Sequence, residues 1–217
     1  MAGRISVNGQ VITQLGVQVD PARDVVAVDG VPVNRPAHRT LMLHKPAGRI
    51  TTCRDPHARD TVMTLVPAIP GLHPIGRLDK DTTGLLLLSN DGDLTFALTH
   101  PRHHVDKTYR AWVEGVPNPE TLTRLRQGVL LGDGPTAPAG VKRVLTREDR
   151  TLVEITIHEG RKRQVRRMLQ VVGHPVISLA RIRIGPLALG DLSEGHWREL
   201  TAEEVRALYR EAGVEKS

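Results

Sequence analysis

Residues 73–94 read HPIGRLDKDTTGLLLLSNDGDL, and the rest of the chain is organised around this stretch. Its four consecutive leucines, residues 85–88, lie between Gly84 and a polar turn at residues 90–92. A short apolar run with such boundaries predicts a strand that is buried on both faces. Asp79 stands in the polar loop before this strand, so a core element would hold its carboxylate in a fixed position.

The composition restricts the class of protein. The 217-residue chain has a formal net charge of +6, which favours a polyanionic partner without separating RNA from DNA or an acidic protein. Aromatic residues make up only 2%, so arginine and phosphate would supply most of any nucleic-acid binding. The single cysteine, Cys53, cannot form an internal disulfide, and no apolar run is long enough to span a bilayer. These features predict a cytoplasmic protein that is not attached to a membrane.

The first part of the chain reads as a small β-rich unit. Asn8-Gly9 and Asp29-Gly30 favour the left-handed conformations of hairpin turns. Residues 34–38, which include Pro36, read as a linker. The expected domains are residues 1–36 and residues 37–217.

Strands and helices alternate irregularly in the remainder. Strands are expected at residues 40–44, 107–113, 151–158 and 179–184, and helices from near residues 91, 118, 165 and 201. Asp91 or Asp93 would cap the first helix, and Thr201 with Glu204 forms a capping box for the last. A Gly/Pro-rich loop is expected at residues 130–140. The arrangement favours an α+β fold with a central mixed, mostly antiparallel sheet flanked by helices.

Asp79, Tyr109 and Arg166 come from separate segments that can form one site. A carboxylate that faces an arginine stays ionised at neutral pH, whereas a buried one without a partner takes up a proton. An ionised Asp79 can attack or stabilise the C1′ atom of a sugar, or remove a proton near it. The Tyr109 ring can stack on an extruded base while its hydroxyl serves as an acid or base.

Three motifs also carry a resemblance: GRLDKDTTGLLLLSNDGDL at residues 76–94, KTYRA at residues 107–111 and GRKRQVRRM at residues 160–168. They resemble those of the ribosomal-RNA pseudouridine synthases in the small-subunit-synthase family, most closely its large-subunit members. The resemblance implies the pseudouridine synthase fold and the isomerisation of uridine to pseudouridine in 23S rRNA, without a metal or other cofactor. VNG at residues 7–9 and DVVAVDG at residues 24–30 resemble the second half of an S4 RNA-binding domain, so residues 1–36 are expected to be a partial S4-like segment.

The resemblance also implies roles for individual residues. Asp79 matches the family's essential aspartate, Tyr109 its active-site tyrosine and Arg166 the arginine that pairs with the aspartate. Arg77 matches the residue that helps to fill the space of the flipped uridine. The expected RNA-contacting residues are Arg77, Lys107, Arg161, Lys162, Arg163, Gln164 and Arg167.

Each residue also has a plainer interpretation. Asp79 can be read as a turn cap, Tyr109 as a half-buried strand residue, and residues 161–167 as a solvated helix face. A metal pair at Asp79 and Asp81 is disfavoured, because no His or Cys cluster surrounds them at ligand spacing. Arg181 and Arg183 suit an edge strand and phosphate binding equally well, and the polar residues 49–60 suit a solvated loop or an RNA contact.

The expected partner is ribosomal RNA, bound by a monomer. The alternative functions are a non-catalytic RNA-binding or ribosome-assembly factor, and a synthase that acts on 16S rRNA or tRNA. The presence of Asp79, Tyr109 and Arg166 together argues against the first alternative, because RNA binding alone does not require all three residues.

Overall fold

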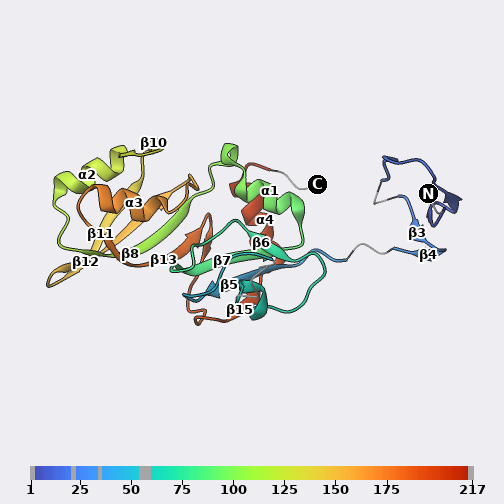
Figure 1. Cartoon of the computed structure of the whole chain (residues 1–217), viewed down its shortest axis with the longest axis horizontal. Helices are drawn as coiled ribbons and strands as arrows, with labels where there is room; N and C mark the ends of the chain where they lie inside the picture. The colour runs from blue at the N-terminus through green and yellow to red at the C-terminus, as the bar shows by residue number, and fades with distance from the viewer. Residues whose placement is uncertain (1–2, 21–22, 34–35, 54–59, 215–217) are drawn as a thin grey trace. The chain divides into compact units, whose positions relative to one another are not determined.

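The computed structural model describes residues 3–20, 23–33, 36–53 and 60–214, and the chain forms two separately packed units, residues 1–37 and 38–217 (Figure 1). Residues 34–35 of the predicted linker and residues 54–59 of the polar stretch lie outside the described residues. None of the helices in the described residues is long and apolar enough to cross a membrane.

The smaller unit is a four-stranded antiparallel sheet in the order β2-β1-β3-β4. Its strands are β1 (Ile5–Val7), β2 (Gln10–Val11), β3 (Val26–Val28) and β4 (Val31–Pro32). Both predicted hairpin turns are confirmed, since Asn8 and Asp29 have φ 51° and the glycines after them have φ 83° and 79°. Positive φ at both central positions is the conformation that Asn-Gly and Asp-Gly adopt at low cost.

The larger unit is built on a nine-stranded sheet whose main path runs β11-β12-β8-β13-β7-β5-β15 (Figure 1). Only the β13–β7 pair is parallel among the paired strands of this sheet. The predicted mixed, mostly antiparallel sheet is therefore confirmed. The strands are β5 (Thr40–Lys45), β6 (His73–Ile75), β7 (Thr83–Ser89), β8 (Lys107–Glu114), β11 (Gly140–Arg147), β12 (Arg150–Ile157), β13 (Val176–Ile184), β14 (Leu187–Ala188) and β15 (Trp197–Glu199).

Strand β7 is the core element that the leucine run predicts. All four leucines, residues 85–88, are completely buried. Leu85 and Leu87 pack with α1 (Gly92–Thr99) and α4 (Ala202–Glu211), while Leu86 and Leu88 pack with the segment that contains the 3₁₀-helix η1 (Val62–Leu65). Burial on both faces explains the absence of any polar residue within the run.

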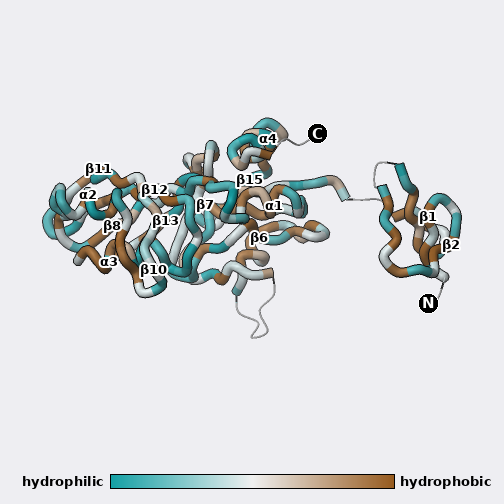
Figure 2. The backbone as a smooth tube through the Cα atoms, turned by 90° about the horizontal axis from the view of Figure 1, so that it is seen from above, coloured by the Kyte–Doolittle hydropathy of each residue, from teal (hydrophilic) through white to brown (hydrophobic). Residues whose placement is uncertain are grey.

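The other half of the sheet is covered by α2 (Pro119–Gln127) and α3 (Gln164–Val171), which pack against β8 and β12 (Figure 1). Figure 2 shows hydrophobic stretches of chain in both halves of this unit. The predicted caps are confirmed: Asp91 accepts from the backbone of α1, Asn118 caps α2, and Thr201 with Glu204 forms the capping box of α4. The short 3₁₀-helix η2 (Pro101–His103) follows α1, as the helix-ending Pro101 predicts.

Two predictions require correction. β13 is a central strand, so the edge-strand interpretation of Arg181 and Arg183 is wrong. Its register shifts between these two residues, and Arg181 is buried while Arg183 is exposed. A periodicity argument cannot detect such a bulge. The predicted loop at residues 130–140 contains a small hairpin, β9 (Leu130–Leu131) and β10 (Gly134–Pro135), and leads into β11, which the sequence did not indicate.

Candidate active site

The loop that carries Asp79 lies between β6 and β7 and is fixed from several directions. The Thr51 hydroxyl donates to the Leu78 carbonyl at 2.9 Å and accepts from the Leu78 amide at 3.3 Å. The Gly48 amide donates to the Lys80 carbonyl at 2.8 Å. The Thr82 amide donates to the Asp79 carbonyl at 3.1 Å, which closes the turn. The Asp79 side chain is thus displayed from a rigid support, with 34% of its surface exposed.

Lys45 holds the same loop from inside. Its side chain is completely buried, and its ammonium donates to the carbonyls of Pro46 and Thr82, both at 2.9 Å, and to that of Lys80 at 3.4 Å. Burial lowers the pKa of Lys45 to about 8, and the negative charges of Asp81 and Asp79 oppose that shift. A buried lysine that satisfies loop carbonyls is a positioning device for the residues around Asp79.

Replacing Lys45 should change how stability depends on pH. The folded-state pKa of about 8 lies below the ordinary value of 10.5, so between these pH values the unfolded chain binds more protons than the folded one. The contribution of Lys45 to stability therefore rises with pH in this window, by about 3 kcal/mol in total. We expect the free energy of unfolding of the wild type, minus that of Lys45→Met, to increase between pH 8 and pH 10.5 in urea titrations. A difference that does not change with pH would contradict this assignment.

Two arginines at the start of α3 reach the loop from the other side of the site. Arg163 makes a bidentate contact with Asp81, with Nη1 and Nη2 each 3.0 Å from a carboxylate oxygen. Arg166 Nη2 donates to the Asp81 carbonyl at 3.0 Å and lies 3.3 Å from its carboxylate. The Arg163 guanidinium holds the pKa of Asp81 below its usual value, so this carboxylate is ionised at neutral pH.

The sequence predicts that Arg166 pairs with Asp79, and the structure places its direct contacts on Asp81 instead. The guanidinium in contact with Asp79 is that of Arg163, whose Nη1 is 3.9 Å from Oδ2. Burial lowers the pKa of Arg166, while the charges of Asp81 and Asp79 act in the opposite direction, so Arg166 still senses Asp79. Within the described residues the Asp79 carboxylate accepts no hydrogen bond, which leaves its oxygens available to a substrate.

Tyr109 lies on β8 where the two halves of the sheet meet. Its half-buried ring packs against both the core beneath α3 and the core that contains Leu78. The Arg181 guanidinium, opposite it on β13, has its central carbon 6.0 Å from the ring centroid. Arg181 is only 3% exposed, and its Nε donates to the Leu85 carbonyl at 2.8 Å. The tyrosine ring is therefore held by a buried cation, the kind of support that keeps an aromatic surface in place for stacking.

A groove of about 430 Å³ borders the Asp79 loop at Asp81 and the start of β7 at Thr83. It continues along β8 and β13 past Arg110, Trp112 and Ile177. Asp79, Tyr109 and Arg166 are not among the described residues that line this groove, which meets the loop only at Asp81.

The predicted RNA-contacting residues differ in their surroundings. Arg77, Lys162 and Arg163 are exposed, whereas the half-buried Lys107 donates to the Val105 carbonyl at 2.7 Å. Burial lowers the pKa of Lys107 to about 8.

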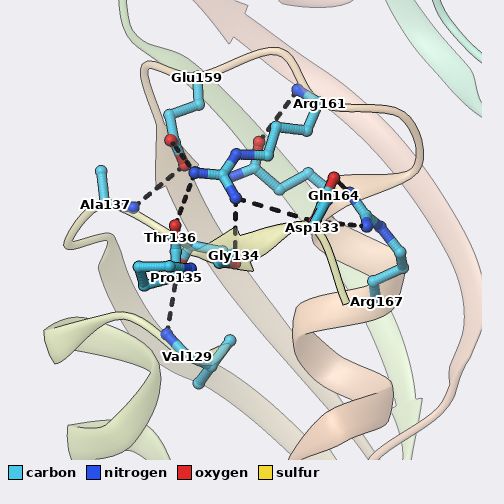
Figure 3. Close-up of polar contacts among 10 residues, drawn as sticks. All are labelled: Val129, Asp133, Gly134, Pro135, Thr136, Ala137, Glu159, Arg161, Gln164 and Arg167. Atoms are coloured by element: carbon cyan, nitrogen blue, oxygen red, sulfur yellow. Dashed lines mark hydrogen bonds and ion pairs between the residues drawn. The ribbon is translucent and has the colours of Figure 1, made fainter. Parts of the chain in front are cut away.

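Gln164 is the clearest departure from the predicted RNA contacts. Its side chain is 3% exposed, donates to Glu159 at 2.6 Å and accepts from the Arg161 amide at 3.2 Å (Figure 3). An RNA contact by Gln164 is incompatible with this burial, so the side chain supports the turn before α3 instead.

Sequence reasoning missed three residues that shape the site: Lys45, Thr51 and Arg181. Most of their contacts are to backbone carbonyls far away in the chain, such as Thr51 to Leu78, Arg181 to Leu85 and Lys45 to Thr82. In the sequence, Lys45 reads only as the end of the strand TLMLHK, and no local pattern shows that its side chain is buried.

Comparison with known proteins gives a consistent result. Residues 39–171 match the family model described as RNA pseudouridylate synthase. The ribosomal large subunit pseudouridine synthase B of Bacillus subtilis is 45% identical over 95% of this chain and 85% of its own length. The ribosomal small subunit pseudouridine synthase A of Escherichia coli is 39% identical over 94% of this chain and 89% of its own. A crystal structure of a pseudouridylate synthase superposes with a TM-score of 0.71 at 32% identity, over 95% of this chain and 89% of that one.

Proposed function

This chain belongs to the RNA pseudouridylate synthase family, and from that premise we propose that it isomerises uridine to pseudouridine in ribosomal RNA at the Asp79 loop. The observation that supports the proposal best is the Asp79 carboxylate, which lies beside the Arg163 guanidinium and accepts no hydrogen bond within the described residues. Tyr109 and Arg166 complete the proposed catalytic set.

The reaction begins with extrusion of the target uridine from its stack. Unstacking costs a few kcal/mol, which base stacking on Tyr109 and phosphate contacts to exposed cations such as Arg77 and Lys162 offset. Enclosure of the base between Tyr109 and the Asp79 loop holds the ribose C1′ atom near the carboxylate.

Asp79 then promotes cleavage of the N1–C1′ bond. The uracil rotates within the site, a C5–C1′ bond forms, C5 loses its proton and N1 gains one, so the product is an isomer of the substrate. Arg163 and Arg166 supply positive charge beside the carboxylate, and Asp81 holds both guanidinium groups in place. The overall reaction is an isomerisation, so it involves no net oxidation or reduction.

We assign the substrate to the large subunit, as 23S rRNA. The support is the 45% identity to the Bacillus subtilis large-subunit enzyme over 95% of this chain. Modification of 16S rRNA is the second candidate, because the small-subunit relative covers 94% of this chain.

The proposal extends to the smaller unit and to the location of the protein. Residues 1–36 would act as a partial S4-like RNA-binding segment and residues 37–217 as the catalytic domain. The two hairpins with the VNG and VDG turns support this division. We further propose that the enzyme acts as a monomer in the cytoplasm, where ribosomal RNA is available.

Deletion of the gene should remove pseudouridine from a defined position in ribosomal RNA. Pseudouridine maps of 23S rRNA, 16S rRNA and tRNA from cells with and without the protein would be compared, with restoration by a plasmid copy as the control. We expect a loss confined to 23S rRNA. Loss confined to 16S rRNA would transfer the substrate to the small subunit, and unchanged maps of both would refute the proposed function.

A further inference from the structure

The arginines of residues 161–167 are paired with carboxylates of the protein itself. Arg167 makes a bidentate contact with Asp133, with Nη1 2.8 Å from Oδ1 and Nη2 3.0 Å from Oδ2 (Figure 3). Arg161 Nη1 lies 3.8 Å from the same Oδ1 atom. Asp133 stands in the turn between β9 and β10, so two arginines from the start of α3 converge on one carboxylate from a neighbouring hairpin.

A carboxylate held by two guanidinium groups occupies the position that a phosphate oxygen pair would take, because arginine forks bind both groups in the same bidentate geometry. We propose that Arg167 and Arg161 form a binding site for a backbone phosphate of the substrate RNA, which Asp133 occupies in the free protein and leaves when RNA binds. The inference rests on the proposed function and names a contact of its substrate.

The location fits a phosphate near the target nucleotide. The Arg167 amide donates to the Arg163 carbonyl at 3.0 Å, so the two residues lie one helical turn apart. The Arg163 guanidinium in turn contacts Asp79 and Asp81 in the Asp79 loop. A phosphate on Arg167 would therefore continue the line of positive charge that leads away from the site.

The exchange requires little rearrangement. Arg167 is 31% exposed and Asp133 49%, and an exposed ion pair alters an equilibrium by no more than about fivefold. Arg161 would stay in position, because it also donates to the carbonyls of Gly134 at 3.1 Å and Pro135 at 2.6 Å. Rotation of the Asp133 side chain into solvent is then sufficient to open the site.

Within the described residues, the Arg167 guanidinium makes hydrogen bonds only to Asp133. Its Nε atom is buried and has no partner there. A guanidinium with so few contacts is a poor structural anchor but is suited to exchanging one anion for another.

A double-mutant cycle tests this proposal. Binding of an unmodified 23S rRNA transcript would be measured by filter retention for the wild type, Asp133→Asn, Arg167→Gln and the double variant. We expect Asp133→Asn to bind roughly twofold to fivefold more tightly, and Arg167→Gln to bind more weakly by a similar factor. In the Arg167→Gln background, Asp133→Asn should raise affinity much less, because only the 3.8 Å contact of Asp133 with Arg161 then remains.

Asp149→Asn is the matched control, since Asp149 is an exposed acid 3.9 Å from Arg150 in the turn between β11 and β12. It removes the same charge elsewhere and should change affinity much less than Asp133→Asn does. Weaker binding by Asp133→Asn, an effect equal to that of Asp149→Asn, or a gain of the same size with and without Arg167 would each overturn the proposal.

Two further measurements separate a change in RNA affinity from misfolding and from a change in catalysis. Thermal unfolding identifies a variant that fails to fold, and Asp133→Ala then repeats the cycle with a side chain that cannot contact Arg167. Pseudouridine formation at saturating RNA should match the wild type in Asp133→Asn. If the wild type itself forms no pseudouridine, the proposed function is wrong. The affinities of the Asp133 and Arg167 variants would still show whether Arg167 binds an RNA phosphate.

Discussion

Asp79→Asn is expected to reduce the rate of pseudouridine formation by at least about a thousandfold while leaving the fold intact. Asparagine has the same shape but is neutral, so it neither attacks C1′ nor accepts a proton. The side chain of Asp79 accepts no hydrogen bond within the described residues, so the substitution removes little from the folded protein. Product would be quantified under single-turnover conditions by digestion of rRNA transcripts to nucleosides and chromatographic separation of pseudouridine from uridine.

Asp81→Asn gives the informative comparison, because Asp81 is two residues away and forms the closer contacts with Arg163 and Arg166. Its expected effect is smaller, roughly tenfold to a hundredfold, through loss of the charge that orients the two guanidinium groups. If Asp81→Asn were inactive and Asp79→Asn active, the catalytic role would belong to Asp81 and not to Asp79. RNA binding should change little in Asp79→Asn, which separates catalysis from binding.

The second large effect is expected at Gly84, where the two halves of the sheet join. β13 and β7 are paired through Ala180–Thr83 and Arg181–Gly84. Gly84 has φ +104°, and a Cβ atom there would lie 2.6 Å from the Arg181 nitrogen and closer still to its carbonyl oxygen. Gly84→Ala should therefore lower the free energy of unfolding by about 2–5 kcal/mol, since the obstacle is backbone and the φ value is unfavourable.

Gly92→Ala is the control for this prediction. Gly92 begins α1, its φ is not in the left-handed region, and a Cβ atom there meets nothing within 4 Å. Alanine should leave stability unchanged or raise it by up to about 1 kcal/mol. Urea unfolding of both variants would measure the change in the free energy of unfolding. A Gly84→Ala protein as stable as Gly92→Ala would contradict the prediction, because β7 and β13 would then accommodate the Cβ atom without loss of stability.

Local patterns were sufficient to predict much of the fold. Buried strand β7, the hairpin turns at Asn8 and Asp29, and the caps at Asn118 and Thr201 depend on residues that are close together in the sequence. Each has a physical cause that acts over a few residues: burial of a continuous apolar run, tolerance of positive φ, or a side chain that accepts a backbone hydrogen bond.

The remaining features depend on contacts between distant segments. Arg181 is buried because β13 is a central strand, whereas the sequence leaves an edge strand equally possible. Asp133 belongs to the predicted loop at residues 130–140, and its contact with Arg167 is visible only in the folded chain. The same limit applies to Arg166, for which a motif identifies the residue but not which of two nearby aspartates it contacts.

Replacement of the N1–C1′ bond by a C5–C1′ bond, which we attribute to Asp79, must release the hydrogen on C5. Incubation of purified protein with 23S rRNA transcripts labelled with tritium at C5 of uridine measures that release directly. We predict tritium release by the wild type that stops at a whole-number ratio to RNA, and no release by Asp79→Asn. RNA binding by the wild type without any tritium release from 23S or 16S transcripts would contradict the proposed role of Asp79.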